Sequence, residues 1–504
     1  MSPIFNVAQL AGVIATIVAA LVAAIPQGLP AADRTVALDE RIRGMMEASG
    51  IPGLAVGVVE DGEVVHLRAF GMARPAEPMT AQTPVVIGSV GKSITGLAIR
   101  QLVEAGRLEL DSPVTRYLPW FALDAPAQTT ERITIGSLVD HTSGISTAAG
   151  QNPALYSPGR SPEGIVRGLA TLRPGNPGVY EYSNLNYVVL GVVLEAVSGT
   201  SYGDYVSSHI FEPLGMTRSF TDLDAASLEH LAQGHRYLFG LPIAFDEPYP
   251  TGMVAAGYQI STTADMARFV AALTNGGVYQ GTDVVPGDGT SSSVRGYGTD
   301  WMPLTALQAG AILSQSGSTL SSNADILVLP SSRVGVVVLL NANPTQLMGI
   351  PAGAADIARE VLREWTGAGS PTNASNVRTV YLAVDLVLLL LIVPFTVHAW
   401  RARSWRRRFA YSRHRGFMVG RTIVADGVLP IAVLGGLPLL IGMTGSSPSG
   451  DVLGGWAFAL WTLPDLAGTV LALAFGGLLL GAIKLTASRG LPRSDQSAPL
   501  TANA

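Results

Sequence analysis

A serine and a lysine three residues apart, Ser89 and Lys92, are the residues of this sequence best suited to do chemistry. They follow the apolar run 84–87 and open a helical pattern that continues to Ala105, so both side chains are expected on one helix face. A serine hydroxyl attacks a carbonyl only when a neighbouring base takes its proton, and a lysine can be that base when burial or adjacent positive charge lowers its pKa. The pair therefore predicts a nucleophile and its proton acceptor, against the alternative of a helix-capping serine beside a solvated lysine.

The same residues partly match the sequence motif of a phosphate-binding loop. Gly91-Lys92-Ser93 matches the end of that motif, but the motif requires glycine at the position that Val86 occupies. The sequence therefore predicts no nucleotide site here.

A second group of polar side chains lies at a predicted helix entrance. The turn-rich stretch 174–184 leads into a helix over 185–199, which places Tyr182 and Asn184 where side chains can point into a cleft. A tyrosine hydroxyl there can carry protons and an asparagine amide can hold a substrate carbonyl, whereas a buried tyrosine beside a capping asparagine is the structural alternative. His141 precedes Thr-Ser-Gly, which favours a hydrogen-bonded turn over a catalytic role.

Strand patterns lie at the two ends of the same region. A hairpin across Asp61-Gly62 is predicted near the start, and His66 is expected to point outward from it. Strands joined by short turns near the end predict antiparallel pairing. The expected fold class is α/β (α+β), an antiparallel sheet flanked by helices plus a helical subdomain, with residues 54–68 beside 312–340. The expected strands are 54–59, 64–67, 312–317, 324–329 and 334–340, and the expected flanking helices are 37–49 and 354–365.

Composition narrows the class of protein. The 504 residues include only 14% charged residues and have a mean hydropathy of +0.35, which is too apolar for a wholly soluble protein. The net charge of −5 gives no indication of a nucleic-acid partner. The absence of cysteine excludes disulfides, thiol catalysis and cysteine metal sites. No metal or organic cofactor is expected, and the oligomeric state is left open.

Apolar segments predict a membrane protein. Residues 1–32 fit a signal peptide or N-terminal anchor, so the chain that follows is expected to be exported. Three later runs have about the 20 residues that cross a bilayer. The segment between the first two runs is rich in arginine and has no acidic residue, which makes it cytoplasmic by the positive-inside rule. The predicted order is an extracytoplasmic domain 33–367, a linker 368–378, a span 379–399, a cytoplasmic loop 400–421, a span 422–443, an extracytoplasmic loop 444–463, a span 464–484 and a cytoplasmic tail 485–504.

Three acidic residues fall within these spans or at their ends. Asp426 and Asp465 are close enough to span ends to be interfacial, whereas Asp385 lies nearly two turns inside the first span. An acid inside a membrane is a candidate functional residue, and for Asp385 the alternative is packing near the outer leaflet.

Three short motifs in order carry a family resemblance. They are Ser89-Val90-Gly91-Lys92, Tyr182-Ser183-Asn184 and Gln315-Ser316-Gly317, supported by 138–144 and 260–266. Together they resemble the serine β-lactamase and penicillin-binding-protein superfamily in its class C-like branch, over residues 37–367.

The resemblance implies a role for each motif. In that family the serine of Ser-x-x-Lys is acylated, so Ser89 would be the nucleophile, with Lys92 and Tyr182 as its proton relay. Asn184 would bind the substrate amide, and the third motif, Gln315, Ser316 and Gly317, would bind substrate at the sheet edge. The backbone N–H groups of Ser89 and Ser318 would form the oxyanion hole.

Gln315 departs from the family pattern, which has lysine or histidine at this place. A lysine there helps to hold a substrate carboxylate, and the neutral Gln315 cannot, so an amide or ester without that anion fits better. The three spans after such a domain also resemble, by architecture, the membrane-anchored peptidases of the colibactin-maturing type, which remove an acyl-D-Asn cap from secreted products.

The sequence thus predicts a membrane-anchored, extracytoplasmic serine hydrolase that cleaves an amide (peptide) or ester bond of a small-molecule or peptide substrate through a Ser89 acyl-enzyme. One alternative is a non-catalytic receptor that binds peptidoglycan or β-lactams and signals through the spans. Another is a β-lactamase or DD-peptidase, which Gln315 disfavours.

Overall fold

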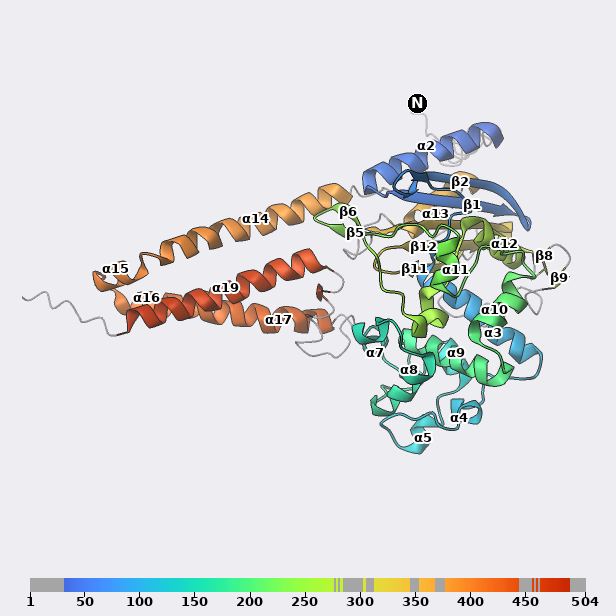
Figure 1. Ribbon diagram of the computed structural model, residues 1–504, viewed down its shortest axis with the longest axis horizontal. Helices are drawn as coiled ribbons and strands as arrows, with labels where there is room; N and C mark the ends of the chain where they lie inside the picture. Colours follow the sequence, from blue (N-terminus) through green and yellow to red (C-terminus); the bar gives the residue numbers. More distant parts are fainter. Residues whose placement is uncertain are drawn as a thin grey trace, which may run out of the picture.

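The structure is a computed structural model, and it describes residues 31–275, 278–279, 282–283, 302–304, 312–344, 353–367, 377–443, 456, 459–460 and 463–489. Most of the predicted leader, linker, outer loop and C-terminal tail lies outside the described residues. The described part has two regions (Figure 1): a domain built on a sheet, and three long helices that extend from one side of it.

The sheet is antiparallel in every described pair and has the strand order β10-β11-β12-β13-β1-β2-β3. The predicted hairpin is confirmed, and so is its pairing with the late strands, since Val56 of β1 lies opposite Val338 of β13. The strands are β1 (Gly53–Glu60), β2 (Glu63–Arg74), β3 (Glu77–Pro78), β10 (Met302–Leu304), β11 (Ile312–Ser318), β12 (Asn323–Leu329) and β13 (Val334–Leu340).

Helices cover both faces of this sheet. Along β1, Leu54 and Val56 pack with α2 (Ala31–Ser49) and α13 (Ala354–Thr366), whereas Ala55 belongs to the larger core on the other face. Successive strand residues point to opposite faces, so a strand covered on both sides is apolar throughout, as β13 is.

The prediction that His66 points outward is wrong. The side chain is buried beneath α2 and α13, with Nε2 at 3.4 Å from Asp39 and the ring centroid at 6.0 Å from that of Trp365. The outer face of β2 was expected to meet solvent, but the first and last helices of the domain cover it together.

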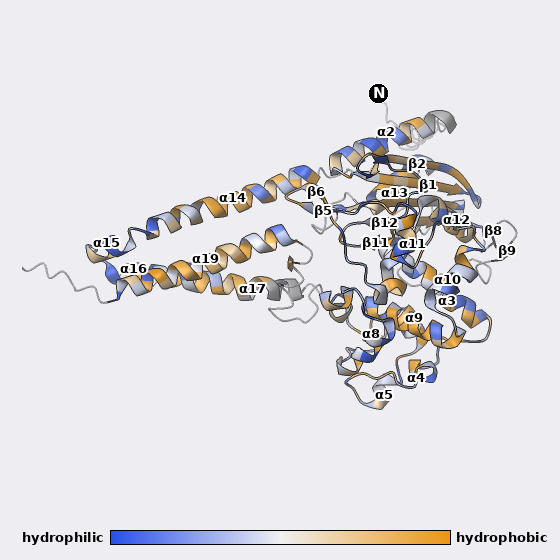
Figure 2. Cartoon of the chain, viewed as in Figure 1, coloured by the Kyte–Doolittle hydropathy of each residue, from blue (hydrophilic) through white to orange (hydrophobic). Residues whose placement is uncertain are grey.

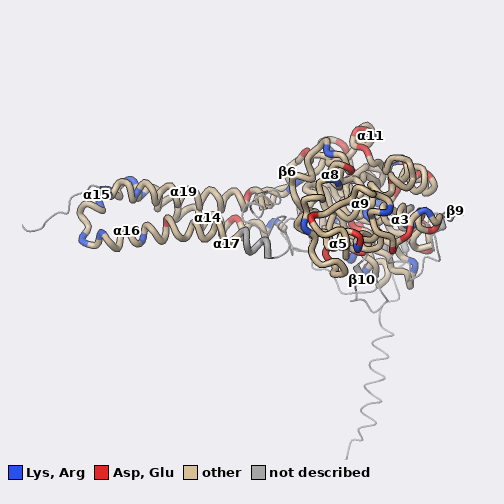
Figure 3. Tube along the Cα trace, turned by 90° about the horizontal axis from the view of Figure 1, so that it is seen from below, with Lys and Arg blue, Asp and Glu red and all other residues tan. Residues whose placement is uncertain are grey.

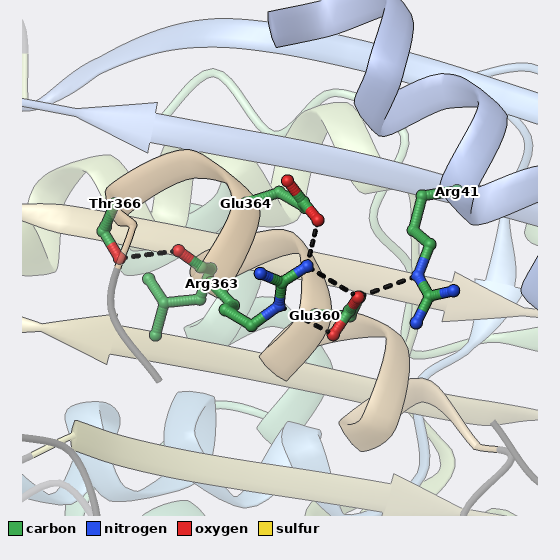
Figure 4. Close-up of polar contacts among 6 residues, drawn as sticks. Arg41, Glu360, Arg363, Glu364 and Thr366 are labelled. Carbon is green, nitrogen blue, oxygen red and sulfur yellow. Dashed lines mark hydrogen bonds and ion pairs between the residues drawn. The ribbon is translucent and has the colours of Figure 1, made fainter. Parts of the chain in front are cut away.

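A charged cluster fastens these two helices to each other (Figure 4). Arg41 of α2 donates to Glu360 of α13 at 2.8 Å, and Arg363 donates to the same carboxylate at 3.0 and 3.2 Å. Glu364 also accepts from Arg363, and Thr366 donates to the Leu362 carbonyl at 2.7 Å to end the helix. Because Glu360 is fully buried, its charge needs both arginines.

The helical subdomain lies below the sheet in Figure 1 and is packed around α9 (Asn184–Ser198), which is buried along most of its length. Its other main helices are α3 (Gly91–Glu104), α6 (Ile135–Val139), α7 (Thr147–Gly150), α8 (Pro162–Gly168) and α10 (Tyr202–Val206), while α12 (Thr263–Thr274) lies against the sheet.

Three helices are long and apolar enough to cross a membrane: α14 (Val377–Ala402), the continuous helix 415–437, and α19 (Pro464–Ser488). The middle one consists of α16 (Arg415–Ile423), a π-helical turn η10 (Val424–Val428) and α17 (Leu429–Met443). Apolar residues dominate all three (Figure 2), and many of their large side chains face outward. A short helix α15 (Trp405–Ala410) lies in the predicted arginine-rich loop.

The domain and the long helices meet at a small hairpin, β5 (His235–Leu238) and β6 (Leu241–Ala244). Tyr237 stacks on Tyr381 of α14 with centroids 6.2 Å apart, and the Phe239 amide donates to Asp465 of α19 at 2.8 Å. Asp465 therefore has a docking role at a helix end. Within the described part of the chain, the carboxyl group of Asp385 makes no hydrogen bond or ion pair, and a function for it stays a prediction.

Candidate active site

Ser89 lies in a tight turn where the helical subdomain meets the sheet. The chain leaves β4 (Val85–Val86) through the 3₁₀ turn η1 (Gly88–Val90) and enters α3. Gly88 has φ +55°, and a Cβ there would lie 2.5 Å from the Ser318 amide nitrogen. A Cβ on Gly317 would lie 2.1 Å from the Ile87 carbonyl oxygen. Only glycine at both positions allows the Ser89 turn to approach the end of β11 so closely.

The structure brings Ser89, Lys92 and Tyr182 together. Ser89 Oγ lies 2.7 Å from Tyr182 Oη, and Lys92 Nζ donates to Ser89 Oγ at 3.0 Å. Since Lys92 donates, the serine proton is free to point toward Tyr182 Oη. The hydroxyl is thus aligned for loss of its proton to the tyrosine oxygen.

Lys92 is fully buried, and its ammonium group meets three acceptors. Besides Ser89 Oγ, these are Asn184 Oδ1 at 2.8 Å and the Ala256 carbonyl oxygen. The Nζ also lies 5.0 Å from the centroid of the Tyr182 ring. Three acceptors match the three protons of a charged lysine, so negative charge that develops on Ser89 or Tyr182 has a cation beside it.

Asn184 is held in place by a residue that the sequence did not indicate, Tyr156. Its Oδ1 accepts from both Lys92 and Tyr182 Oη, the latter at 3.1 Å, and its Nδ2 donates to Tyr156 Oη at 2.7 Å. Burial raises the pKa of Tyr156, which keeps it a neutral phenol. Tyr156 lies in an irregular segment whose residue types carry no periodic signal, and no sequence pattern could have found it.

His141 supports the tyrosine loop from behind. The buried ring lies 4.7 Å from the Tyr182 ring, and its Nδ1 accepts from the Ser183 amide at 3.1 Å and meets the Asn186 amide at 2.9 Å. The structural role that the sequence favoured for His141 fits this position.

The third motif lies on β11, next to the Ser89 turn. Gln315 is 3% exposed, and its Nε2 donates to the Ser89 carbonyl at 3.3 Å, while Oε1 has no hydrogen-bond partner among the described residues. Ser316 donates to the buried carboxyl of Asp325 on β12. Gly317 and Ser318 follow where β11 comes closest to the Ser89 turn. The backbone amides of Ser89 and Ser318 therefore lie on neighbouring segments.

Glu247 is a further charged group near the site that no pattern indicated. It accepts from Tyr258 Oη at 2.8 Å and from Ser321 Oγ at 2.7 Å. The Tyr258 ring lies 6.0 Å from that of Tyr156, which holds Asn184. This carboxylate makes the neighbouring side of the site less favourable for an anionic substrate group. In the described residues, no group of three His, Asp or Glu side chains is placed to hold a metal ion.

An antiparallel sheet with flanking helices, joined to a helical subdomain at a Ser-x-x-Lys turn, defines the β-lactamase and transpeptidase fold. The chain belongs to the β-lactamase family, whose sequence profile matches residues 38–358.

Among curated proteins, the chain is similar to the Bacillus subtilis protein PbpX, named for penicillin binding, at 29% identity over 49% of this chain and 61% of that protein. The chain therefore spans less than two thirds of this relative's length. It is 24% identical to protein flp of Staphylococcus aureus strain MRSA252 over 88% of each chain.

Solved structures agree on the fold. An octameric penicillin-binding protein homologue from Pyrococcus abyssi has a TM-score of 0.54 at 25% identity, covering 68% of this chain and 79% of its own. The D-alanine carboxypeptidase AmpC from Burkholderia cenocepacia has a TM-score of 0.51 at 22% identity, covering 66% of this chain and 99% of its own.

Asp325 predicts a pH dependence of stability. Burial raises its pKa to about 8, whereas an unfolded aspartate titrates near ~3.9. Between these values the folded state keeps a proton that the unfolded state has lost, so stability falls as pH rises from about 4 to about 8 and then levels off.

We expect Asp325→Asn to flatten this slope, since the amide oxygen still accepts from Ser316 and cannot ionise. Denaturant unfolding near pH 4.5, 6 and 8 measures this slope. The wild type and the variant should have similar free energies of unfolding near pH 4.5. At higher pH the variant should become more stable than the wild type, by at most about 1.4 kcal/mol per pH unit. Parallel curves for the two proteins would contradict the burial of an ionisable carboxyl at this position.

Proposed function

We propose that this protein is a membrane-anchored serine hydrolase that cleaves an amide or ester bond through an acyl-enzyme on Ser89. The observation that carries the proposal is the placement of Ser89 Oγ within hydrogen-bond distance of both Tyr182 Oη and the buried Lys92 ammonium. Membership of the β-lactamase family, which includes serine hydrolases, supports the same chemistry.

In the acylation step, Tyr182 acts as its phenolate, and Ser89 Oγ attacks the substrate carbonyl carbon as its proton passes to that phenolate. The carbonyl oxygen becomes an oxyanion, which the backbone N–H groups of Ser89 and Ser318 would stabilise. Negative charge thus moves from Tyr182 to the carbonyl oxygen, and Lys92 stabilises it while it lies on Tyr182 or Ser89. The carbon then expels its amine or alcohol, which leaves with the proton from Tyr182, and the acyl group remains as an ester on Ser89.

In the deacylation step, water takes the place of the leaving group. Tyr182 accepts a proton from the water as the water oxygen attacks the ester carbonyl. Collapse of the second oxyanion breaks the bond to Ser89, whose oxygen recovers the proton, and the acid is released.

The substrate class follows from the uncharged third motif. Gln315 has a buried amide oxygen with no hydrogen-bond partner among the described residues, and such an acceptor suits an N–H group of the substrate better than a carboxylate. The negative charge of Glu247 also disfavours a substrate carboxylate. We therefore assign amides or esters without a free carboxylate at this position. A D-alanine carboxypeptidase activity, as in the name of one structural relative, or a β-lactamase activity, as in the name of the family, is less favoured.

The arrangement of charge supports an extracytoplasmic hydrolase domain. Arginine and lysine gather at the end of the long helices farthest from the domain, around α15 and α16 (Figure 3). By the positive-inside rule that end would be cytoplasmic, and the domain would then lie on the other side of the membrane.

A receptor is the second candidate function, because the hydrolase-like domain contacts the membrane helices directly. The Tyr237–Tyr381 stack and the Phe239–Asp465 hydrogen bond could transmit a change in the domain to α14 and α19. Such a protein would need neither turnover nor an activated serine, so activity measurements separate the two candidates.

We expect Ser89→Ala to lower hydrolysis of a chromogenic acyl ester or amide by at least about a thousandfold, because only the nucleophile is removed. Ser93→Ala is the matched control, since this buried serine of α3 has no hydrogen-bond partner for its hydroxyl among the described residues. The control should keep activity, and both variants should melt like the wild type. Activity of Ser89→Ala near that of the control would exclude the mechanism.

We expect Gln315→Lys to raise turnover of substrates with a free carboxylate by about tenfold, the effect of one charge-assisted hydrogen bond. Gln315→Met is the neutral control. The measurement compares kcat/KM for a carboxylate substrate and its methyl ester with each variant. An equal effect of lysine and methionine on both substrates would show that residue 315 does not contact the substrate carboxylate.

A further inference from the structure

A groove runs along the membrane part of the molecule between α14 and the helix formed by η10 and α17. Its volume is about 590 Å³. Most of its lining is apolar and comes from both of these helices and from α19, which forms the floor. The apolar lining residues include Leu391, Phe395, Leu429, Val433, Leu473 and Ala474.

Glycines on α19 explain why the groove exists. A Cβ on Gly476 would lie 2.7 Å from Phe395 of α14, and one on Gly477 would lie 3.0 Å from Pro430 of α17. Both outer helices therefore pack closely on α19. The groove lies between these two outer helices, next to α19.

One end of the groove contains a charge that the protein already balances. Asp426, in the π-helical turn, is 4% exposed and accepts from Lys484 at 2.6 Å, and His398 Nε2 lies 2.7 Å from its other oxygen. The sequence placed Asp426 near a membrane interface, and its pairing with residues from two other helices was not foreseen. Because Lys484 neutralises Asp426, this carboxylate leaves little charge for a ligand.

Two arginines at the same end of the groove have no acidic partner of this kind among the described residues. Arg401 and Arg421 both line the groove, and neither forms an ion pair in the part of the chain that the structure describes. Arg401 lies one helical turn beyond His398, so the guanidinium groups lie at the end far from the hydrolase domain, where a bilayer changes from hydrocarbon to headgroups.

We propose that this groove binds a membrane phospholipid with an anionic headgroup. The phosphate would lie between Arg401 and Arg421, which match its charge and its capacity for paired hydrogen bonds, and an acyl chain would lie along the apolar wall. The apolar N-terminal segment of this chain is a poorer occupant, because residues 1–32 contain no acidic side chain to meet the arginines. The lipid comes from the leaflet far from the hydrolase domain.

Native mass spectrometry of the full-length, delipidated protein tests this site. Phosphatidylglycerol should bind at least tenfold more tightly than phosphatidylcholine with the same acyl chains, and glycerol 3-phosphate should not compete at equal concentration. The double variant Arg401→Gln/Arg421→Gln should lose this preference. Arg406→Gln/Arg407→Gln removes the same charge from exposed positions of α15 outside the groove and should retain it.

A second variant tests whether weaker lipid binding results from a change in the groove or from loss of folding. Leu391→Trp fills the groove without a change of charge and should also weaken binding of phosphatidylglycerol, with an unchanged melting temperature. Equal binding of the two lipids, an equal loss in the control double variant, or competition by glycerol 3-phosphate would each overturn the proposal. The last result would indicate an anion site without a lipid.

Discussion

The close approach of the Ser89 turn to β11 is the constraint on which the candidate site depends. Ser89 belongs to the start of α3, and the N–H groups of its turn and of Ser318 come from opposite sides of the seam between helical subdomain and sheet. Gly88 and Gly317 lack the Cβ atoms that would separate these segments, since such atoms would lie within 2.5 Å of the opposing backbone. The seam is therefore narrow, as the proposed acylation requires, in which one substrate carbonyl would meet the hydroxyl and two backbone donors together.

The buried ammonium group of Lys92 places a positive charge at the same seam. A buried ammonium group is stable only when acceptors replace water, and Ser89, Asn184 and the Ala256 carbonyl do so. Tyr156 and His141 then hold Asn184 and the Tyr182 loop in place. The polar network is continuous from Ser89 through Lys92 and Asn184 to Tyr156, so contacts within the protein itself set the geometry of the candidate site.

The parts of this arrangement that were predictable are those that local patterns encode. Helical spacing placed Ser89 beside Lys92, and a turn followed by a helix placed Tyr182 and Asn184 at one entrance. Strand patterns predicted the antiparallel sheet and its neighbours. Tyr156 and Glu247 reach the site from irregular segments, where residue type carries no periodicity. The burial of His66, like the pairing of Asp426 with Lys484, depends on contacts between elements far apart in the chain, which no local pattern specifies.

The central claim is that Ser89 is an activated nucleophile, and covalent labelling tests it most directly. The full-length protein would be treated with a fluorophosphonate probe, and intact-mass spectrometry with peptide mapping would locate the adduct. A single adduct on Ser89 is the predicted result. A correctly folded protein with no adduct, or with an adduct on another residue only, would contradict the account and favour a receptor.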